Sequence, residues 1–467
     1  MGGKVMKKSF ITMFVICAGV LSFSSCQKEL VNNVAEQSQS GTISRTVTVS
    51  PDPWTGDETK TAYVSGTGIQ ITGTEKMSVF YGPYTEDETV TSLASVTGNL
   101  TQGIEPTNGK WSFSHSAIDG ASAYNYLFVL PYANQITSIN DAKTALRLEL
   151  PFIQFPSEDS FDSGCDFLLG QPQFNMEQKT EVPDIKFKRL FAPFKVEILD
   201  GKGVLGNEKI RTVTFKTDIV AGDNALVGRM CYATFNSDYT KTQVGGWGTN
   251  DPGNSLTAFY GTGHTARNAW FIVNPRTIPK DTKITLIVTT DSKTVTRTAA
   301  LTRDETINRF EFNGVQFDIS GDGYTEETTE FFDFNAISAA ADIASITGSN
   351  GTTSPWTQSN GSTIVEPMCF RLKYNSKSTK NASLSLKASK KVTKIRFYSH
   401  PRQPYASGEI KLNDADATVI STIYSKPAAN GGYIDIDIPE ALQSSTITLS
   451  AKTNITVFTG ATLFYGE

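Results

Sequence analysis

Few residues of this chain have the types and the spacing that catalysis requires. Only three histidines occur, His115, His264 and His400, and they lie far apart in the sequence. A Ser-His-Asp site needs one histidine bonded to both of its partners, and the Gly-x-Ser-x-Gly, His-Glu-x-x-His and Cys-x-x-Cys spacings are missing. A glycosidase, which uses a pair of carboxylates, stays an alternative, since the sequence does not show which acids lie close together. The sequence therefore favours a protein without catalysis, cofactor or metal.

The clearest chemical signal is a cysteine close to the N-terminus. Two lysines precede an apolar run from Phe10 to Phe23, which is shorter than the roughly 20 residues of a membrane span. Two serines then lead to Cys26, and this resembles a bacterial lipobox, whose cysteine is lipidated and becomes the new N-terminus. The Gln-Lys-Glu that follows resembles the tag of surface-exposed lipoproteins of Bacteroidetes-type bacteria. We predict a lipid anchor at Cys26, in the outer membrane and exposed at the cell surface; the alternative is an uncleaved N-terminal anchor.

The charge balance limits the kind of partner. Removal of residues 1–25 takes away three lysines and no acid, so the net charge changes from −5 to −8. A nucleic-acid partner requires a basic face, and we therefore exclude nucleic acid. Beyond the signal region, Cys165, Cys231 and Cys369 are too far apart for a disulfide framework and are predicted to be isolated buried thiols.

One acidic segment starts like a calcium-binding loop. Asp318, Ser320 and Asp322 have the spacing of an EF-hand loop, but its twelfth position, which must be a bidentate acid, is Thr329. The flanking helices are also not expected. We therefore predict a solvated linker at 318–330 rather than a metal site.

The apolar residues follow the period of short strands. Alternation of apolar and polar residues predicts many half-buried strands and no long helix. The segment 336–346 is the one candidate for a short helix. The predicted strands are Thr46–Val49, Met77–Tyr81, Tyr124–Leu130, Leu146–Leu150, Asp184–Phe187, Phe194–Leu199, Arg211–Lys216, Trp270–Val273, Ile284–Thr289, Arg309–Phe312, Phe370–Tyr374, Ser383–Lys387, Val392–Tyr398, Glu409–Leu412, Tyr433–Ile438, Thr446–Ser450 and Ile455–Phe458.

These strands fall into three sets. Evenly spaced short strands with turn signals are typical of antiparallel sandwiches. We predict an all-β chain with the following parts: a signal peptide (1–25), a tether (26–45), two tandem β-sandwiches (46–200 and 201–317), a linker (318–330) and a C-terminal, jelly-roll-like β-sandwich (331–467).

Several short motifs of the first two sets resemble the fimbrillin-like lipoproteins of Bacteroidetes, the subunits of surface pili. The motifs occur in the family's order between residues 46 and 317. They are Thr59-Lys60-Thr61 before a strand, the Tyr-x-x-x-x-Pro-Tyr pattern of Tyr126–Tyr132, the Phe-x-x-Leu-x-Ala pattern that starts at Phe187, and the Trp270–Pro275 strand.

The resemblance implies a mechanism of assembly. In the family, a strand of one subunit fills a groove in another, and a protease opens that groove by cutting after an Arg or Lys near the N-terminus. Arg45 stands at the corresponding place, and the alternative is an arginine of the tether that is never cut. The implied partners are other pilin subunits, joined by strand addition.

The segment 331–467 changes the role in a pilus that the resemblance would otherwise imply. A stalk subunit donates its C-terminal segment, whereas here that end belongs to a further domain. We therefore expect adhesion, or a tip, accessory or anchor subunit of a pilus. The alternative is a glycan-binding lipoprotein of a polysaccharide-uptake system, with host or dietary glycan held by Trp356, Tyr405 and Arg402 on exposed loops. The sequence favours core or turn positions for these aromatics over a glycan site.

Overall fold

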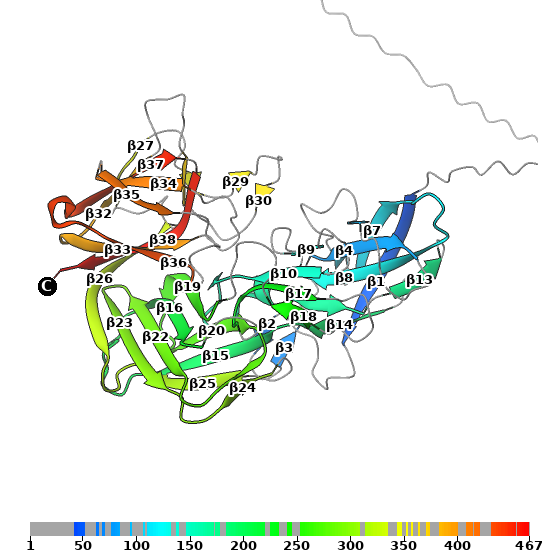
Figure 1. Cartoon of the computed structure of the whole chain (residues 1–467), viewed down its shortest axis with the longest axis horizontal. Helices are drawn as coiled ribbons and strands as arrows, with labels where there is room; N and C mark the ends of the chain where they lie inside the picture. Colours follow the sequence, from blue (N-terminus) through cyan, green and yellow to red (C-terminus); the bar gives the residue numbers. More distant parts are fainter. Residues whose placement is uncertain are drawn as a thin grey trace, which may run out of the picture. The chain divides into compact units, whose positions relative to one another are not determined.

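The computed structural model describes an all-β protein (Figure 1). It describes residues 42–51, 62–64, 68–70, 76–84, 94–95, 106–107, 110–131, 137–139, 146–171, 173–177, 184–219, 225–232, 241–244, 253–308, 313–334, 343–347, 352–353, 356–357, 363–364, 370–373, 383–399, 408–413, 415–420, 431–453 and 455–466. Within these residues the helical segments are two single 3-10 turns, Ser163–Cys165 and Glu440–Leu442. The predicted all-β fold class is confirmed, and no described helix has the length and apolar character of a membrane span.

The N-terminal strands form one large mixed sheet. Its order is β5-β4-β8-β12-β14-β1-β7-β6, with β13 pairing β8. The bounds are β1 Thr42–Pro51, β4 Ser78–Pro83, β5 Ala94–Ser95, β6 Pro106–Thr107, β7 Lys110–Ser116, β8 Ala123–Leu130, β12 Leu168–Gly170, β13 Gln173–Glu177 and β14 Ile185–Arg189.

Strand β8 is buried on both faces, which explains its continuous apolar sequence. Tyr126 and Phe128 belong to the core of the N-terminal sheet. Leu127 and Val129, which point the opposite way, belong to a second core that also contains Phe215 and other residues of the following strands. The first and second strand sets are therefore joined through shared apolar packing, a source of stability that scales with the apolar area removed from water.

The second set is a sandwich of two sheets around that shared core. One sheet has the order β11-β19-β16-β22-β23-β26, and the other has the order β20-β15-β25. Strands β21 and β24, which are separated in the chain by β22 and β23, form a further two-stranded antiparallel sheet. The bounds are β11 Ile153–Gln154, β15 Ala192–Leu199, β16 Ile210–Thr217, β19 Ser255–His264, β20 Asn268–Val273, β21 Arg276–Ile278, β22 Lys283–Thr290, β23 Lys293–Ala300, β24 Glu305–Ile307, β25 Asn313–Asp318 and β26 Thr325–Asp333.

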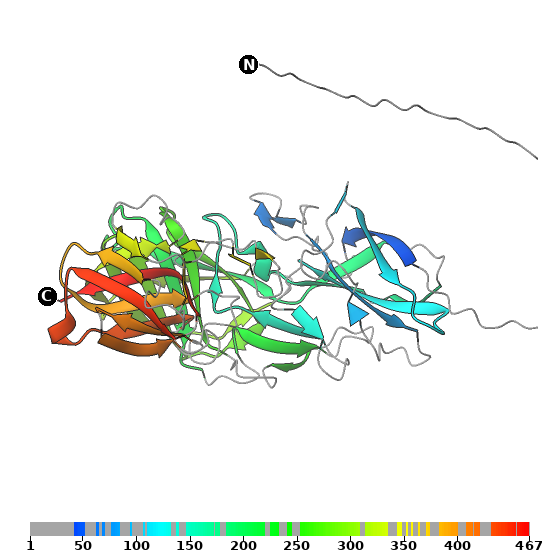
Figure 2. The ribbon, with the colours of Figure 1, turned by 90° about the horizontal axis from the view of Figure 1, so that it is seen from above.

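The C-terminal block is a sandwich of its own, and we call it the C-terminal sandwich. Figure 2 shows it from above. One sheet has the path β26-β38-β31-β28, with β33 on β38 and β36 on β33, and the other has the order β27-β32-β37-β34-β35. Both sheets contribute to one core. The bounds are β27 Ile343–Thr347, β28 Thr352–Thr353, β31 Phe370–Lys373, β32 Ser383–Lys387, β33 Val392–Ser399, β34 Gly408–Leu412, β35 Ala415–Ile420, β36 Tyr433–Asp437, β37 Thr446–Thr453 and β38 Ile455–Tyr465.

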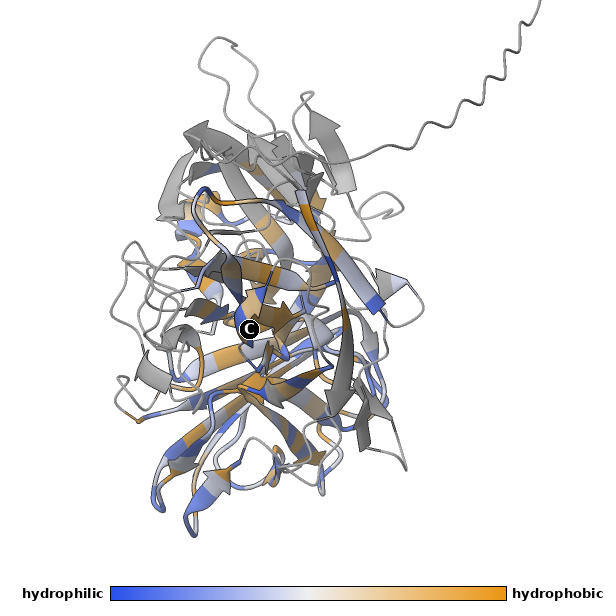
Figure 3. Ribbon diagram, turned by 90° about the vertical axis from the view of Figure 1, so that its right-hand side faces the viewer, coloured by the Kyte–Doolittle hydropathy of each residue, from blue (hydrophilic) through white to orange (hydrophobic). Residues whose placement is uncertain are grey.

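The alternation that predicted these strands also sets their faces. In β36, Ile434 and Ile436 pack on the core of the C-terminal block while Asp435 and Asp437 are exposed. In Figure 3 apolar positions gather between the packed sheets, and hydrophilic positions gather at the ends of the hairpins. Each predicted strand that lies within the described residues coincides with an observed strand. The predicted strand Leu146–Leu150 is β10, which has the same bounds. The predicted strand Arg309–Phe312 lies outside the described residues.

Two predicted segments have a different structure. The segment 318–330, expected to be a solvated linker, is a turn followed by the first part of β26, which pairs with β23 and then with β38. Its first four residues, Thr325–Thr328, are exposed, and the β-branched threonines suit an extended strand. Within the segment expected to be a short helix, 343–346 lies in strand β27, because pairing with β32 outweighs a weak local helix preference.

Candidate functional site

The second sandwich has an open sheet edge at β25. This strand pairs in parallel with β15 over Asn313–Asp318 and is the last strand of its three-stranded sheet. The opposing sheet has twice as many strands, so part of its inner face has no strand opposite it among those described. An unpaired strand edge presents free N–H and C=O groups to any added strand.

A second open edge lies on β23. This strand pairs with β22 from Lys293 to Ala300. Its pairing with β26 covers Lys293–Thr296 and then ends. Over 297–300 the described structure therefore pairs β23 on one side only.

Two adjacent hollows, which share lining residues, lie between the edges of β23 and β25. The smaller has a volume of about 210 Å³ and the larger about 540 Å³. Both are lined by Ile284, Leu301, Glu305, Gly314 and Val315. We call this continuous space the β23/β25 groove.

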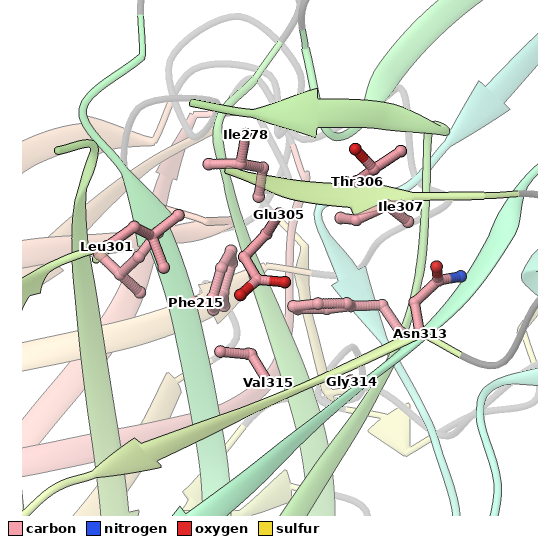
Figure 4. A pocket seen from close by; sticks show the side chains of 11 residues that line it. Phe215, Ile278, Leu301, Glu305, Thr306, Ile307, Asn313, Gly314 and Val315 are labelled. Carbon is pink, nitrogen blue, oxygen red and sulfur yellow. The ribbon is translucent and has the colours of Figure 1, made fainter. Parts of the chain in front are cut away.

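The inner end of the β23/β25 groove is lined by apolar and polar side chains together. Phe194 and Phe215, which are almost fully buried, lie there with their ring centroids 5.2 Å apart, and the paired strands β21 and β24 add Ile278 and Ile307 beside Glu305 and Thr306. Figure 4 shows the carboxylate of Glu305 pointing into the space between Leu301, Phe215 and Val315. Glu305 is 27% exposed, and its described ion-pair partner is Arg303, which is 79% exposed, at 2.8 Å.

The other end of the groove is closed by Arg297. Its guanidinium donates to the carbonyl oxygens of Asp318 and Asp322 and lies 5.6 Å from the ring centre of Phe317. A Cβ on Gly321 would come within 2.4 Å of that guanidinium, so a larger residue there would displace the Arg297 side chain. The β23/β25 groove is therefore acidic at one end and basic at the other.

The structure places Arg45 within a strand rather than in a tether. It lies in β1 opposite Phe113 of β7 and is 4% exposed. Its guanidinium donates to the hydroxyl of Tyr126 and to the Glu177 carbonyl. Cleavage after Arg45 stays a prediction, and in this conformation a protease reaches the bond only when β1 leaves the sheet.

Arg45 starts a chain of hydrogen bonds that ends at a histidine. His115 Nδ1 lies 2.9 Å from the Ser116 carbonyl oxygen and must donate to it, so Nε2 accepts from the Tyr126 hydroxyl at 2.7 Å. Burial lowers the pKa of His115, the nearby Arg45 charge lowers it further, and the Ser116 hydrogen bond acts in the opposite direction. Burial also raises the pKa of Tyr126.

The other chemical candidates are not brought together. His264 packs against Tyr260 with ring centroids 4.0 Å apart and the rings tilted by 58°, its ring nitrogens have no hydrogen-bond partner among the described residues, and burial lowers its pKa. The buried thiol of Cys165 lies 3.4 Å from a carboxylate oxygen of Asp162, and Cys231 lies in a strand, β17 (Gly228–Tyr232). The described residues hold no cluster of three or more His, Cys, Asp or Glu that could bind a metal.

The calcium-like segment is a tight turn. The Asp318 carboxylate accepts from the backbone N–H and the hydroxyl of Ser320, at 3.0 and 2.8 Å. The hydroxyl bond is the main reason that the pKa of Asp318 is lowered. The Asp318 carboxylate thus accepts hydrogen bonds that hold the turn.

The predicted glycan contacts are largely beyond the described residues. Trp356 lies in a short strand, β29 (Trp356–Thr357), paired with β30 (Thr363–Ile364). Tyr405, Arg402, His400, Cys369 and the lipidation site Cys26 lie outside the described residues. Contact with a glycan and lipidation stay predictions.

Sequence reasoning did not find the β23/β25 groove. The inner residues Arg297, Ala299 and Leu301 alternate with Thr298 and Ala300, which signals a strand with one covered face. Such alternation shows which side chains face inward, but it does not show that the strand's outer edge lacks a partner. The open edge is a property of long-range pairing.

No protein-family model and no curated protein matches the chain. The solved structures that it matches include a candidate cell adhesion protein from Bacteroides uniformis, which is 10% identical with a TM-score of 0.32 over 62% of this chain and 98% of that one. Another is a fimbrial assembly protein from Parabacteroides distasonis, which is 8% identical with a TM-score of 0.27 over 62% and 95%. A CBM35 domain from Cellvibrio japonicus is 15% identical, with a TM-score of 0.17 over 30% and 94%. The first two are of the fimbrial and adhesion class that the sequence motifs resemble.

Proposed function

We propose that this protein is a lipid-anchored surface protein of adhesion or pilus assembly, placed at the tip, base or side of a pilus, which accepts a strand from another subunit in the β23/β25 groove. The observation that carries the proposal is the pair of open edges, on β23 and β25, with a hollow between them that Leu301, Val315 and Glu305 line. A strand that adds to a sheet edge gains main-chain hydrogen bonds and places alternate side chains in the pockets. No catalysis is part of the proposal.

The C-terminal strand supports an accepting role. Strand β38 pairs with β26, β31 and β33 at once. Phe458, Ala461 and Leu463 of this strand are fully buried. A strand held on both sides cannot be donated without unfolding the C-terminal sandwich, so the chain is expected to receive a strand and not to pass one on.

Peptide binding to the mature protein tests the accepting groove. The protein, with Cys26→Ser to keep it soluble, is mixed with a panel of capped ten-residue peptides that alternate Val and Thr. Binding is read by fluorescence anisotropy, and hydrogen exchange locates the peptide. We expect saturable binding that protects the amides of 314–318.

A plugged groove provides the matched control. Leu301 lines both hollows and is only partly buried. Leu301→Trp should fill the space, keep the circular dichroism of the wild type and lower peptide affinity about tenfold or more. Peptide binding without protection of β25, or equal binding to the plugged variant, would remove the groove from the proposal.

The glycan-binding alternative has its own test. It predicts saturable binding of a polysaccharide that is lost on Trp356→Ala or Tyr405→Ala and kept in the Leu301→Trp variant. Such a result would favour a polysaccharide-uptake lipoprotein over a pilus component.

A further inference from the structure

We infer that the strand accepted by the β23/β25 groove carries a lysine or arginine that inserts beside Leu301 and Val315 and pairs with Glu305. This inference rests on the proposed function and adds the chemistry of the residue that is recognised. The occupant to which it commits is an extended segment of a second protein chain.

The position of Glu305 is the first argument. Its carboxylate points into a space walled by Leu301, Phe215 and Val315 (Figure 4). A carboxylate that loses water among apolar side chains is unfavourable unless a cation or hydrogen-bond donors compensate it. The Arg303 partner is two residues away and 79% exposed, so its charge is screened by solvent and compensates little.

The apolar walls are the second argument. A lysine or arginine side chain buries its methylene stem against apolar surface and keeps its charge at the tip. Leu301 and Val315, which line the hollow and are only partly buried, offer such a surface, whereas the rings of Phe194 and Phe215 are almost fully buried. The inner hollow thus matches a side chain that is long, apolar along its stem and positive at its end.

The size of the inner hollow is the third argument. Its volume of about 210 Å³ lies below the roughly 300–1,000 Å³ of sites for free small ligands. It is therefore suited to a single side chain presented from a backbone. The larger hollow, at about 540 Å³, continues along β25 and provides room for that backbone.

The far end of the groove limits where the cation can lie. Arg297 closes that end, with its guanidinium held by two carbonyl oxygens and by Phe317. A second cation there would face a like charge, which is unfavourable. The charge pattern of the groove thus favours one orientation of the added strand.

Three peptides that differ at one position test the inference. Each is a capped ten-residue Val/Thr peptide with lysine, norleucine or glutamate at one central inward position. Norleucine keeps the stem of lysine and removes its charge. The proteins are the mature wild type, Glu305→Gln, Glu305→Lys and the plugged Leu301→Trp, each checked for wild-type circular dichroism.

We expect the wild type to bind the lysine peptide about tenfold more tightly than the norleucine peptide, since close charge pairs at interfaces contribute this much or more. In Glu305→Gln the difference should disappear, and in Glu305→Lys the glutamate peptide should become the preferred one. Raising the salt concentration should reduce the wild-type preference.

Two other results overturn the inference and are distinguishable. If the three peptides bind the wild type equally and all lose affinity in Leu301→Trp, the accepting groove stands and the cation is not recognised. If none of the three binds the wild type, the groove and the cation site are both excluded. Tight binding of free N-acetyl-lysine amide, equal to that of the lysine peptide, would contradict recognition of a strand.

Discussion

At the scale of single residues, the most unusual feature is a buried arginine in the first strand. Arg45 donates to Tyr126 and to a backbone carbonyl, and Tyr126 in turn donates to His115. His115 also packs against the rings of Tyr81 and Tyr124, with centroids 3.9 and 4.9 Å away. A proton on Nε2 of His115 would replace its acceptor lone pair and add a second positive charge beside Arg45. The network is therefore stable only while His115 is neutral.

Acid should weaken the fold through this histidine. Because the pKa of His115 is lower in the folded state, the unfolded chain, with an ordinary histidine pKa of about 6.5, binds the proton more readily. The free energy of unfolding is then highest above pH 6.5 and falls as the pH drops from there to the folded-state pKa, by at most about 1.4 kcal/mol per pH unit for one histidine. Urea titrations between pH 8 and pH 5 measure this slope.

Single substitutions show which histidine causes the pH dependence of the free energy of unfolding. His115→Gln should flatten part of it, and His264→Gln another part, because burial lowers the pKa of His264 as well. If His115→Gln leaves the pH dependence unchanged, His115 is not the group that titrates.

At the scale of elements, strand β26 joins the second sandwich to the C-terminal one. It pairs with β23 over its first residues and with β38 over its last. A small aromatic cluster lies at this junction, where the ring centroid of Phe259 is 5.6 Å from the ring centroids of Tyr398 and Phe331. The Tyr398 hydroxyl lies 3.1 Å from the Thr212 hydroxyl. The two sandwiches are therefore connected by a shared strand and by packed side chains.

Glycines allow this close approach. A Cβ on Gly460 would lie 2.7 Å from the Phe332 carbonyl oxygen and 2.8 Å from Phe259. Gly432, with φ of +89°, would place a Cβ 2.4 Å from Ile153. These positions have no room for a side chain.

Gly460→Val should therefore destabilise the protein by about 1–3 kcal/mol, the usual range for overpacking, and lower its melting temperature. Gly201→Val is the matched control, because a Cβ there would meet only Ser320 at 3.9 Å. Thermal melts of both variants against the wild type measure the difference. Equal melting temperatures for the two variants would show that the junction is not tightly packed.

At the scale of the whole molecule, the order of sites along the chain links anchoring to processing. The predicted lipid on Cys26 lies upstream of the predicted cut after Arg45, so a cut chain loses its lipid. The cut would also remove the residues that pair with 113–116 of β7 and the buried side chain of Ile43. A chain with both a lipid anchor and an intact β1 is the form that suits a role at the cell surface.

Digestion with an Arg-specific protease tests this arrangement. We expect the native protein to be cut after the exposed Arg303 well before Arg45, and about 2–3 M urea to increase cutting at Arg45 as β1 opens locally. N-terminal sequencing identifies Thr46, and size exclusion should show that the cut chain alone does not polymerise, because β38 is held on both sides. Rapid native cutting at Arg45 would contradict the protection of this bond by β1, and polymers of the cut chain alone would contradict the expectation that β38 is not donated.

The sequence by itself determined the secretion and lipidation signals as predictions, and it determined the strands. Apolar residues at every second position predicted strands such as β1 and β36, because the two faces of such a strand differ in burial whichever strand lies beside it. The family resemblance came from short motifs in order along the chain.

Only the tertiary structure decided which strands pair. It placed Arg45 in a buried network, made a shared strand of the expected linker and left the edges of β23 and β25 open. Pairing depends on residues far apart in the chain, such as Thr329 and Phe464, and no local pattern encodes such a choice. Glu305 illustrates this limit, because in the sequence it is an ordinary acid of a short strand, and it becomes a candidate recognition group only through the strands that surround it.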